Sequence, residues 1–466
     1  MLVDEKCTLS GAQIHKGFAC LLNQVQIKTN ANKFFRLDLV TKTGKYYLWK
    51  RWGRVGAPGA VMLSSEMPEF QAIMQFEKTF KDKTGLSWDD RESTPMEDHY
   101  AYMKLDCAPS SSGVVSALVS LVDPTLDDRV ADVVKEICDE RLMSSAIVSY
   151  DIDITRLPLG KLRVDQLNMA EDILKEIEQL VQGQQGSNTS ADHKSRLERC
   201  SSKFWTLVPQ ASKLNQRLPI LSSLAEVQHW ARVLEGLRNI QVAAVALQGS
   251  NTLGGLYRSM GIELLPCTDL EKEMLTLLLE GSNSIIHGFK IKLVEAMTIL
   301  KPSHDTRDVG NVFTSLADHR YLFHGSKTSN FMGIFTEGLR IPRQDQVSNG
   351  STLGLGCYFA DCSTKSLQYC GTDSNGFGYM LVCEVALGNK HQVQNCCMDV
   401  VQAPYTSRMA RGMKTIDFVE CDGIYYPKGP IHDKADNSYS TFKHNEYVIF
   451  RKEQYRFRYL IRVQKY

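Results

Sequence analysis

The hydrophobic pattern changes twice along this 466-residue chain, and the order of the three patterns limits the folds that it can adopt. Short aromatic and β-branched runs come first, helical periodicity follows, and strand-like runs return in the last part. One hydrophobic core rarely organises more than roughly 250–300 residues. The sequence therefore predicts an α+β multidomain protein, with a small α/β domain at 1–106, a linker at 107–114, an all-helical domain at 115–250 and a β-rich domain at 251–466.

The first domain shows local signals for a hairpin and a helix. Residues 34–40 and 45–49 are strand-like runs on either side of Thr43-Gly44, which favours a tight hairpin turn. From 68 to 83, apolar residues recur at helical spacing, and Gly85 follows as a C-cap. These signals predict a sheet followed by one helix.

The remaining two domains differ in their periodicity. Helices are expected at 127–137, 165–182 and about 223–248, where apolar residues fall on one helical face. Residues 379–387 are apolar at nearly every position, which is typical of a central strand covered on both faces. Near the end, residues 455–463 alternate apolar side chains with arginines, which predicts a half-buried strand.

Charge and composition exclude several classes of protein. Residues 1–60 contain seven Lys and three Arg against three acids, a surplus that suits a phosphate-binding face as well as an ordinary solvated surface. No apolar run approaches the roughly 18 residues of a membrane span. The 13 cysteines include no Cys-x-x-Cys pair, so reduced thiols are expected and structural zinc is not. Rossmann and Walker-type glycine motifs are also absent from the sequence.

Four segments of the last domain carry reactive or ligand-binding side chains. They are Tyr321–Ser326, Gly356–Asp361, Lys365–Tyr369 and Asn445–Tyr447. Each has a simpler structural explanation by itself: a histidine at a strand end, a core tyrosine, or a carboxylate capping an edge strand. Only their combination in one domain points to a site.

Together these segments resemble the diphtheria-toxin-like ADP-ribosyltransferases, and specifically the DNA-dependent poly(ADP-ribose) polymerases. The signature of that family is a His, Tyr, Glu triad on separate strands, which His324, Tyr358 and Glu446 match in order. Residues 50–56 resemble the WGR domain of the family, and residues 156–162 resemble its regulatory helical domain. The resemblance therefore covers nearly the whole chain.

The resemblance implies NAD+ as co-substrate, no metal, and a nicotinamide pocket. The Gly325 backbone and the Ser366 hydroxyl would hold the carboxamide, while Tyr358 and Tyr369 would stack on the ring. Glu446 would accept a hydrogen bond from the 2′-hydroxyl of the neighbouring ribose. That role suits the chemistry, because breaking the N-glycosidic bond builds oxocarbenium character on the ribose and nicotinamide leaves as a neutral molecule.

Further binding residues follow from the same resemblance. The adenosine half of NAD+ would contact the residues His324, Ser326, Asn330 and Arg340, and Lys365 would help to place the acceptor. A broken DNA end would contact Trp52 by stacking and Arg54 through phosphate, and three neighbouring positions are Asn32, Lys33 and Tyr100. The expected partners are DNA ends and acceptor proteins, including the chain itself, and no membrane. A DNA substrate implies the nucleus.

Two departures from the family pattern leave more than one function open. On the acceptor side, residues 350–353 are smaller than usual and Leu355 replaces a lysine, so transfer of a single ADP-ribose unit competes with polymer synthesis. In the regulatory helix Glu235 is acidic, whereas Arg232 and Asn239 replace two acids, which suggests a different or weaker autoinhibition. The same domain order would also suit a catalytically silent DNA-end scaffold or an NAD+ glycohydrolase. The presence of Glu446 argues against the scaffold and Lys365 against the glycohydrolase.

Overall fold

The computed structural model describes residues 3–103, 126–139, 164–182, 191–213, 216–249, 252–302, 304, 312–341, 353–354, 356–397 and 401–466. The expected linker, the 156–162 motif, residues 350–352 and Leu355 lie outside this described part. Contacts divide the chain into two compact units. Unit 1 contains Met1–Ser112 and Met143–Ala244, and unit 2 contains Gly113–Leu142 and Val245–Tyr466.

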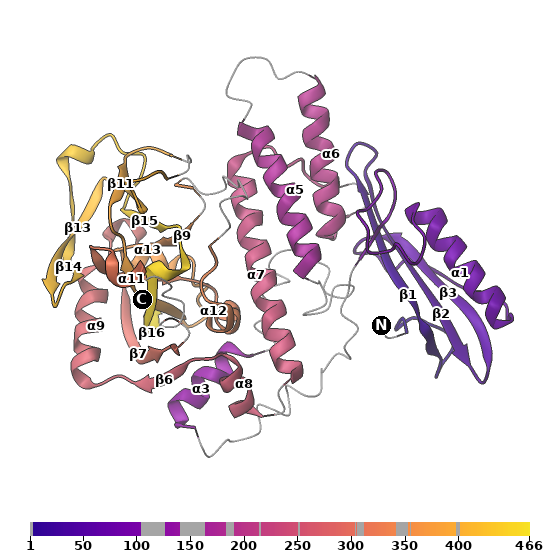
Figure 1. Ribbon diagram of the computed structural model, residues 1–466, viewed down its shortest axis with the longest axis horizontal. Helices are drawn as coiled ribbons and strands as arrows, with labels where there is room; N and C mark the ends of the chain where they lie inside the picture. Colours follow the sequence, from indigo (N-terminus) through magenta and orange to yellow (C-terminus); the bar gives the residue numbers. More distant parts are fainter. Residues whose placement is uncertain are drawn as a thin grey trace. The chain divides into compact units, whose positions relative to one another are not determined.

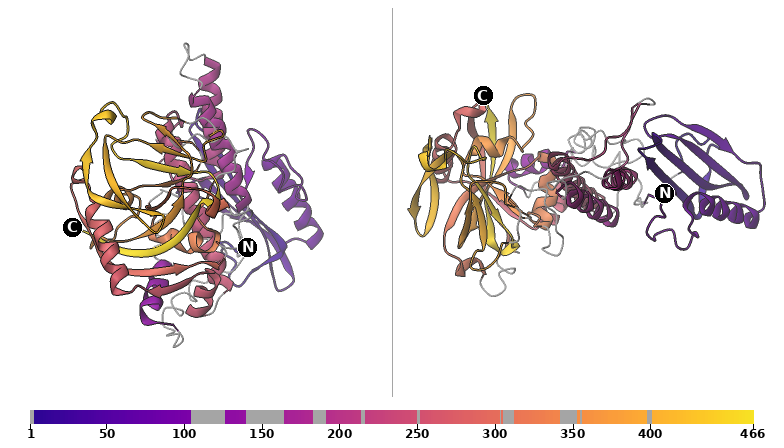
Figure 2. Two further views of the ribbon diagram at one scale, coloured as in Figure 1. Left: turned by 60° about the vertical axis from the view of Figure 1, so that its left-hand side comes forward. Right: turned by 90° about the horizontal axis from the view of Figure 1, so that it is seen from above.

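Unit 1 begins with a five-stranded antiparallel sheet in the order β4-β3-β2-β1-β5 (Figure 1). Its strands are β1 (Gln13–Gln26), β2 (Ala31–Lys42), β3 (Lys45–Arg54), β4 (Ala60–Leu63) and β5 (Ala101–Tyr102). Helix α1 (Glu69–Thr84) lies on one face of the sheet, as the view from above in Figure 2 shows. Its buried Phe76 and Phe80 pack against strand residues such as Leu37.

The predicted local signals of this domain are confirmed. Thr43 and Gly44 have positive φ angles of 49° and 77° and connect the paired residues Lys42 and Lys45, as a two-residue hairpin turn requires. Helix α1 ends at Gly85, whose φ of 76° is the left-handed conformation of a C-cap. Partly buried Arg36 and buried Arg51 contact the buried carboxylates Asp4 and Asp38, so these charges are compensated inside the sheet.

Three long helices also lie in unit 1, apart from the last turn of the third, which belongs to unit 2. They are α5 (Val164–Gln182), α6 (Ala191–Leu207) and α7 (Leu224–Gly249), and they run side by side (Figures 1 and 2). Arg238 on α7 donates to Asn168 on α5 at 2.5 Å and pairs with Glu171 at 3.3 Å. Helices α5 and α7 confirm the helical periodicity expected at 165–182 and about 223–248, whereas α6 was not predicted from the sequence.

Helix α3 (Asp128–Ile137) forms as predicted, but it belongs to unit 2. Asp127 caps its N-terminus by accepting from the Arg129 amide. Glu136 accepts a hydrogen bond from the Tyr379 hydroxyl at 2.8 Å and pairs with Arg462 at 3.1 Å. The helical region between 115 and 250 is therefore shared between two compact units.

Unit 2 is built on two sheets. The seven-stranded sheet has the order β13-β14-β8-β10-β16-β7-β6, and the four-stranded sheet has the order β11-β12-β15-β9. The strands are β6 (Glu263–Pro266), β7 (Ile291–Leu300), β8 (His319–Gly325), β9 (Cys357–Phe359), β10 (Phe377–Ala386), β11 (Lys390–Val393), β12 (Ser407–Ala410), β13 (Lys414–Cys421), β14 (Ile424–Asp433), β15 (Glu446–Ile449) and β16 (Tyr455–Lys465). The two sheets meet where Phe323 bridges to Ala360.

Short helices cover and connect these strands. They are α8 (Leu253–Ser259), α9 (Asp269–Gly281), α11 (Val312–Ser315), α12 (Phe331–Glu337) and α13 (Ser363–Leu367), with four single-turn helices at 285–287, 328–330, 435–437 and 452–454. Leu275, Leu278 and Leu279 of α9 pack on the seven-stranded sheet. Within the described part of the chain, no helix has both the length and the apolar character needed to cross a membrane.

The central strand was predicted correctly and the last strand only in part. Strand β10 is buried at nearly every position between β8 and β16. Strand β16, expected to be half-buried, is also largely buried, because its arginine-bearing face is covered too, for example by Glu136 of α3, which pairs with Arg462. Its Arg456 is buried with its guanidinium 4.2 Å from the centre of the Phe313 ring.

Candidate active site and DNA-binding surface

A close approach of two backbones joins β8 to α13. Gly325 ends β8, and a Cβ atom built there would lie 2.8 Å from the carbonyl carbon of Ser366. Only glycine fits this position without displacing α13. The Ser366 hydroxyl donates to the Phe323 carbonyl at 3.3 Å. The bare backbone and the hydroxyl that are expected to hold a carboxamide therefore lie next to each other.

His324 is fixed in one protonation state. Burial lowers the pKa of its imidazole, so the ring is neutral at physiological pH. Its Nδ1 lies 2.9 Å from the Tyr358 carbonyl oxygen, which can only accept a hydrogen bond. Nδ1 therefore carries the proton, and Nε2 is left as an acceptor for a hydroxyl group. The Tyr358 hydroxyl donates to the Gly354 carbonyl at 2.8 Å.

Glu446 begins β15 and is held by one cation. Lys365 of α13 donates from Nζ to Oε1 of Glu446 at 2.5 Å, and the two side chains are 14% and 22% exposed. Among the described residues, none donates a hydrogen bond to Oε2. Val448 pairs with Tyr358, so Glu446 lies on the strand next to β9. The structure thus places Glu446 and Tyr358 on the paired strands β15 and β9, and β8, which carries His324, bridges to the end of β9 at Phe323 and Ala360.

Asp361 positions the residues on both sides of Glu446, a role that sequence reasoning did not assign. It is 2% exposed, and its Oδ2 accepts from Asn445 at 2.8 Å and from the Tyr447 hydroxyl at 2.9 Å. Burial raises the pKa of the Asp361 carboxyl. Nothing in the sequence pattern indicates these contacts, because positions 361 and 445 are joined only by strand packing.

The expected adenosine-binding residues follow β8 directly. Asn330 donates to the Ser326 hydroxyl at 3.0 Å, while its own Oδ1 is buried with no hydrogen-bond partner in the described part of the chain. A buried acceptor of this kind suits a ligand hydroxyl or amine. Arg340, which follows the buried Leu339 in the sequence, is partly buried. The ring of Tyr369, two residues beyond the end of α13, is 50% exposed.

A second unexpected cluster lies beside Glu446. Ligand atoms of His287, Cys362 and His444 lie within 4.8 Å of one another, a donor set that can hold a transition metal. Burial, His287 and three lysines, one of which is Lys365, lower the pKa of His444 to about 3. The same lysines would repel a metal cation. The twelve described cysteines, Cys362 among them, are free thiols.

The five expected DNA-binding residues have different surroundings. Trp52 is 38% exposed and stacks on Phe35 at 6.3 Å, and Lys33 is exposed. The Tyr100 ring is partly buried, with Lys83 Nζ 5.8 Å from its centre. Trp52 and Lys33 are therefore available to a ligand on the surface of the N-terminal sheet.

Asn32 and Arg54 instead contact the segment between α6 and α7. The Asn32 amide donates to the Gln210 carbonyl and the Ser212 hydroxyl, both at 2.9 Å. Arg54 donates to the carbonyls of Ser212 at 3.2 Å and Gln216 at 2.8 Å, and to two oxygens of Asn30. These side chains connect the sheet to the helices within unit 1.

Comparison with known proteins agrees with this organisation. Residues 18–95 match the WGR domain, residues 124–254 the poly(ADP-ribose) polymerase regulatory domain, and residues 271–465 the poly(ADP-ribose) polymerase catalytic domain. These three matches, in this order, define a WGR-containing ADP-ribosyltransferase architecture. The chain belongs to the poly(ADP-ribose) polymerase family, as the resemblance in its motifs predicted.

Curated relatives are similar over most of this chain. Poly(ADP-ribose) polymerase 1 of Gallus gallus is 28% identical over 468 residues, which cover 96% of this chain and 45% of the relative. Poly(ADP-ribose) polymerase 2 of Homo sapiens is 28% identical over 99% of this chain and 83% of its own length. Poly(ADP-ribose) polymerase 2 of Zea mays is 26% identical over 95% of this chain and 69% of its own length. The chain thus spans about half the length of the first of these relatives.

Proposed function

We propose that this chain transfers ADP-ribose from NAD+ to proteins, including itself, and that a DNA end activates the transfer. One observation carries the catalytic part: Glu446 has one carboxylate oxygen fixed by Lys365 and the other without a partner among the described residues. A carboxylate fixed in this way can accept a hydrogen bond from a ribose hydroxyl.

The residues of the site have distinct tasks in this reaction. Glu446 Oε2 accepts a hydrogen bond from the ribose 2′-hydroxyl and stabilises the positive charge that develops as the bond to nicotinamide breaks. Gly325 and Ser366 orient the carboxamide, and the neutral Nε2 of His324 accepts from a hydroxyl of the adenosine ribose. Lys365 holds Glu446 and helps to place the acceptor nucleophile. No general acid is required, because nicotinamide leaves as a neutral molecule.

DNA binding is assigned to the surface that carries Trp52 and Lys33. The aromatic ring suits an exposed terminal base or sugar, and the lysine suits phosphate. Asn32 and Arg54 join this sheet to the helical segment, so they provide a physical connection through which a DNA end can affect the helices. A DNA substrate implies that the protein acts in the nucleus.

The test is incorporation of labelled NAD+ with and without a short blunt duplex, analysed on a gel. We expect labelling that depends on the duplex and is lost in Glu446→Gln. The matched control is Glu420→Gln, which neutralises an exposed carboxylate elsewhere in unit 2. A smear indicates polymer and a sharp band indicates single units. Full labelling by Glu446→Gln would contradict the assignment, and duplex binding without any labelling would favour a silent scaffold.

A further inference from the structure

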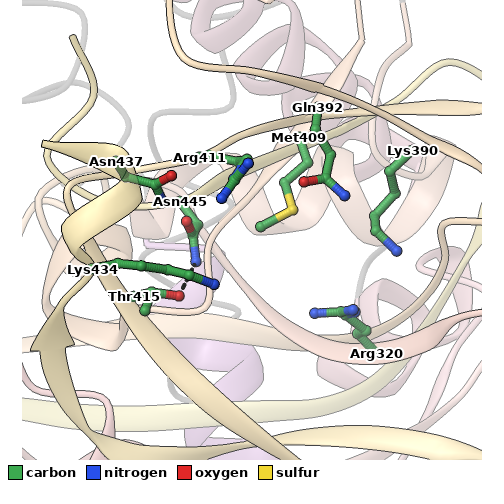
Figure 3. Close-up of a pocket in the computed structure, with 9 residues that line it drawn as sticks. All are labelled: Arg320, Lys390, Gln392, Met409, Arg411, Thr415, Lys434, Asn437 and Asn445. Atoms are coloured by element: carbon green, nitrogen blue, oxygen red, sulfur yellow. Dashed lines mark hydrogen bonds between the residues drawn. The ribbon is translucent and has the colours of Figure 1, made fainter. Parts of the chain in front are cut away.

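A pocket of unit 2 is lined by cations and by no acid. Its volume is about 320 Å³, and its lining residues are Arg320, Lys390, Gln392, Met409, Arg411, Thr415, Lys434, Asn437 and Asn445. Figure 3 shows the charged ends of the two arginines and two lysines around one shared space. No sequence motif indicated this pocket, because its cations come from four separate segments.

The carboxylates around the pocket compensate only part of its charge. Asp318 pairs with Lys390 and, at 2.6 Å, with Arg320. Arg411 is 3.4 Å from Asp436, whose side chain is 68% exposed. Lys434 has no ion pair with any residue in the described ranges. A third carboxylate, the buried Asp361, lies behind the pocket and accepts a hydrogen bond from the lining residue Asn445. Four cations against these three carboxylates leave the concave site with a net positive charge.

Strand geometry separates this pocket from the candidate active site. Ala410 pairs with Glu446, so Arg411 lies across from Asn445. Successive side chains of a strand point to opposite faces. Arg411 and Asn445 therefore face the pocket, and Glu446 faces away from it. A ligand in the pocket can be bound at the same time as NAD+.

We propose that this pocket binds the diphosphate group of an ADP-ribose unit. A diphosphate diester carries two negative charges, which suit a concave site lined by four cations and no acid. Arginine and lysine both bind phosphate oxygens through charge-assisted hydrogen bonds. The side-chain amide of Gln392, exposed at the rim, adds a neutral donor.

The identity of the ligand rests on the proposed function, since ADP-ribose is the group that the enzyme would transfer. Two sources share this chemistry: free ADP-ribose, and ADP-ribose already attached to protein. Attached units would keep a modified chain at the enzyme, on the opposite face of β15 from Glu446.

The experiment measures binding of ADP-ribose to the full chain by calorimetry. The test variant combines Lys434→Gln with Arg411→Gln. The matched control combines Lys428→Gln with Lys292→Gln, which removes the same charge from exposed positions of unit 2 outside the pocket. We expect two ADP-ribose sites in the wild type and in the control. In the test variant one site should weaken by about 100-fold, because each lost charge-assisted hydrogen bond accounts for roughly tenfold.

A second arm distinguishes the source of the ligand. Immobilised self-modified protein is the probe, and the analytes are Glu446→Gln chains with and without the two pocket substitutions. Loss of capture in the pocket variant supports attached ADP-ribose, and an effect on free ADP-ribose alone supports the free ligand. Equal binding by the test and control variants in both arms overturns the proposal. The calorimetric arm needs no turnover, so a chain without transferase activity still tests the pocket.

Discussion

Replacing Gly325 by alanine tests the contact that shapes the nicotinamide side of the site. The new Cβ atom would lie 2.8 Å from the Ser366 carbonyl carbon and 3.1 Å from Cys370 Sγ, with the Ser366 carbonyl oxygen closer still. Carbon atoms in good contact are about 3.5 Å apart, so Ser366 must move by at least about 0.7 Å, and its closer carbonyl oxygen requires more. The obstructing atoms belong to the backbone of α13, so a side-chain rotation cannot relieve the clash.

Two effects of different size follow from this displacement. Overpacking of this kind costs about 1–3 kcal/mol of unfolding free energy, which lowers the Tm of unit 2 by several degrees. Lys365 and Ser366 both lie on α13, so they move with it. A misplacement of about 1 Å in a catalytic constellation can cost about 100-fold in rate. We therefore expect a loss of transfer activity much larger than the loss of stability implies.

The matched control is Gly378→Ala on the neighbouring strand β10. A Cβ atom at Gly378 would lie 3.4 Å from its nearest neighbour, Thr372 Cγ2, which is ordinary contact. Initial rates of labelled NAD+ incorporation and thermal melting are measured for both variants. If Gly325→Ala transfers ADP-ribose at the wild-type rate, or if both variants lose activity equally, the close approach of β8 and α13 does not shape the site.

Two other predictions concern contacts away from the candidate active site. Arg54→Ala removes hydrogen bonds to the carbonyl of Gln216 and to other oxygens, so the contact between sheet and helices should weaken by about 1.5–3 kcal/mol. Hydrogen exchange around residue 216 should then accelerate. The control Lys33→Ala should weaken duplex binding and leave that exchange unchanged. Unaltered exchange in Arg54→Ala would refute the contact. His319 has a raised pKa because Glu384 accepts its hydrogen bond at 2.7 Å. The His319–Glu384 pair stabilises the fold in full below the unfolded pKa of histidine, about 6.5. This stabilisation is lost as the pH rises through the pKa of His319 in the folded protein, which is higher. The difference in Tm between wild type and His319→Gln should therefore shrink from pH 6 to pH 9, and it corresponds to at most about 1 kcal/mol; a difference that grows with pH would contradict this.

Local signals in the sequence predicted some elements of the fold, whereas others, such as α6, α9 and β7, were not predicted. The turn at Thr43-Gly44, the C-cap at Gly85 and the central strand β10 depend on neighbouring residues, so their residue types reveal them. The three segments that carry His324, Tyr358 and Glu446 were recognised as motifs, and the structure places them on adjacent strands.

Features that depend on strand order could not be predicted in this way. In the seven-stranded sheet, β8 lies between β14 and β10, so neighbours in space are distant in sequence. Asp361 and Asn445 meet because β9 pairs with β15 in the four-stranded sheet. The cations of the pocket likewise come from segments that are distant in sequence. Asn32 and Arg54 were expected to face DNA because their motif suggested it. Their partners, at positions 210, 212 and 216, lie in an irregular segment between α6 and α7. Nothing in the sequence of that segment indicates the contact.

The placement of α3 matters for anyone who divides this protein into fragments. A fragment that starts at α8 keeps both sheets of unit 2 but loses Glu136, the partner of the Tyr379 hydroxyl and of Arg462. The buried Cys138 side chain, 3.9 Å from the Met332 sulfur, would be lost as well. Such a fragment exposes an edge that the intact chain covers with residues from before the long helices. A faithful catalytic fragment therefore has to include two separate pieces of the chain, the residues of α3 and the residues from α8 onward.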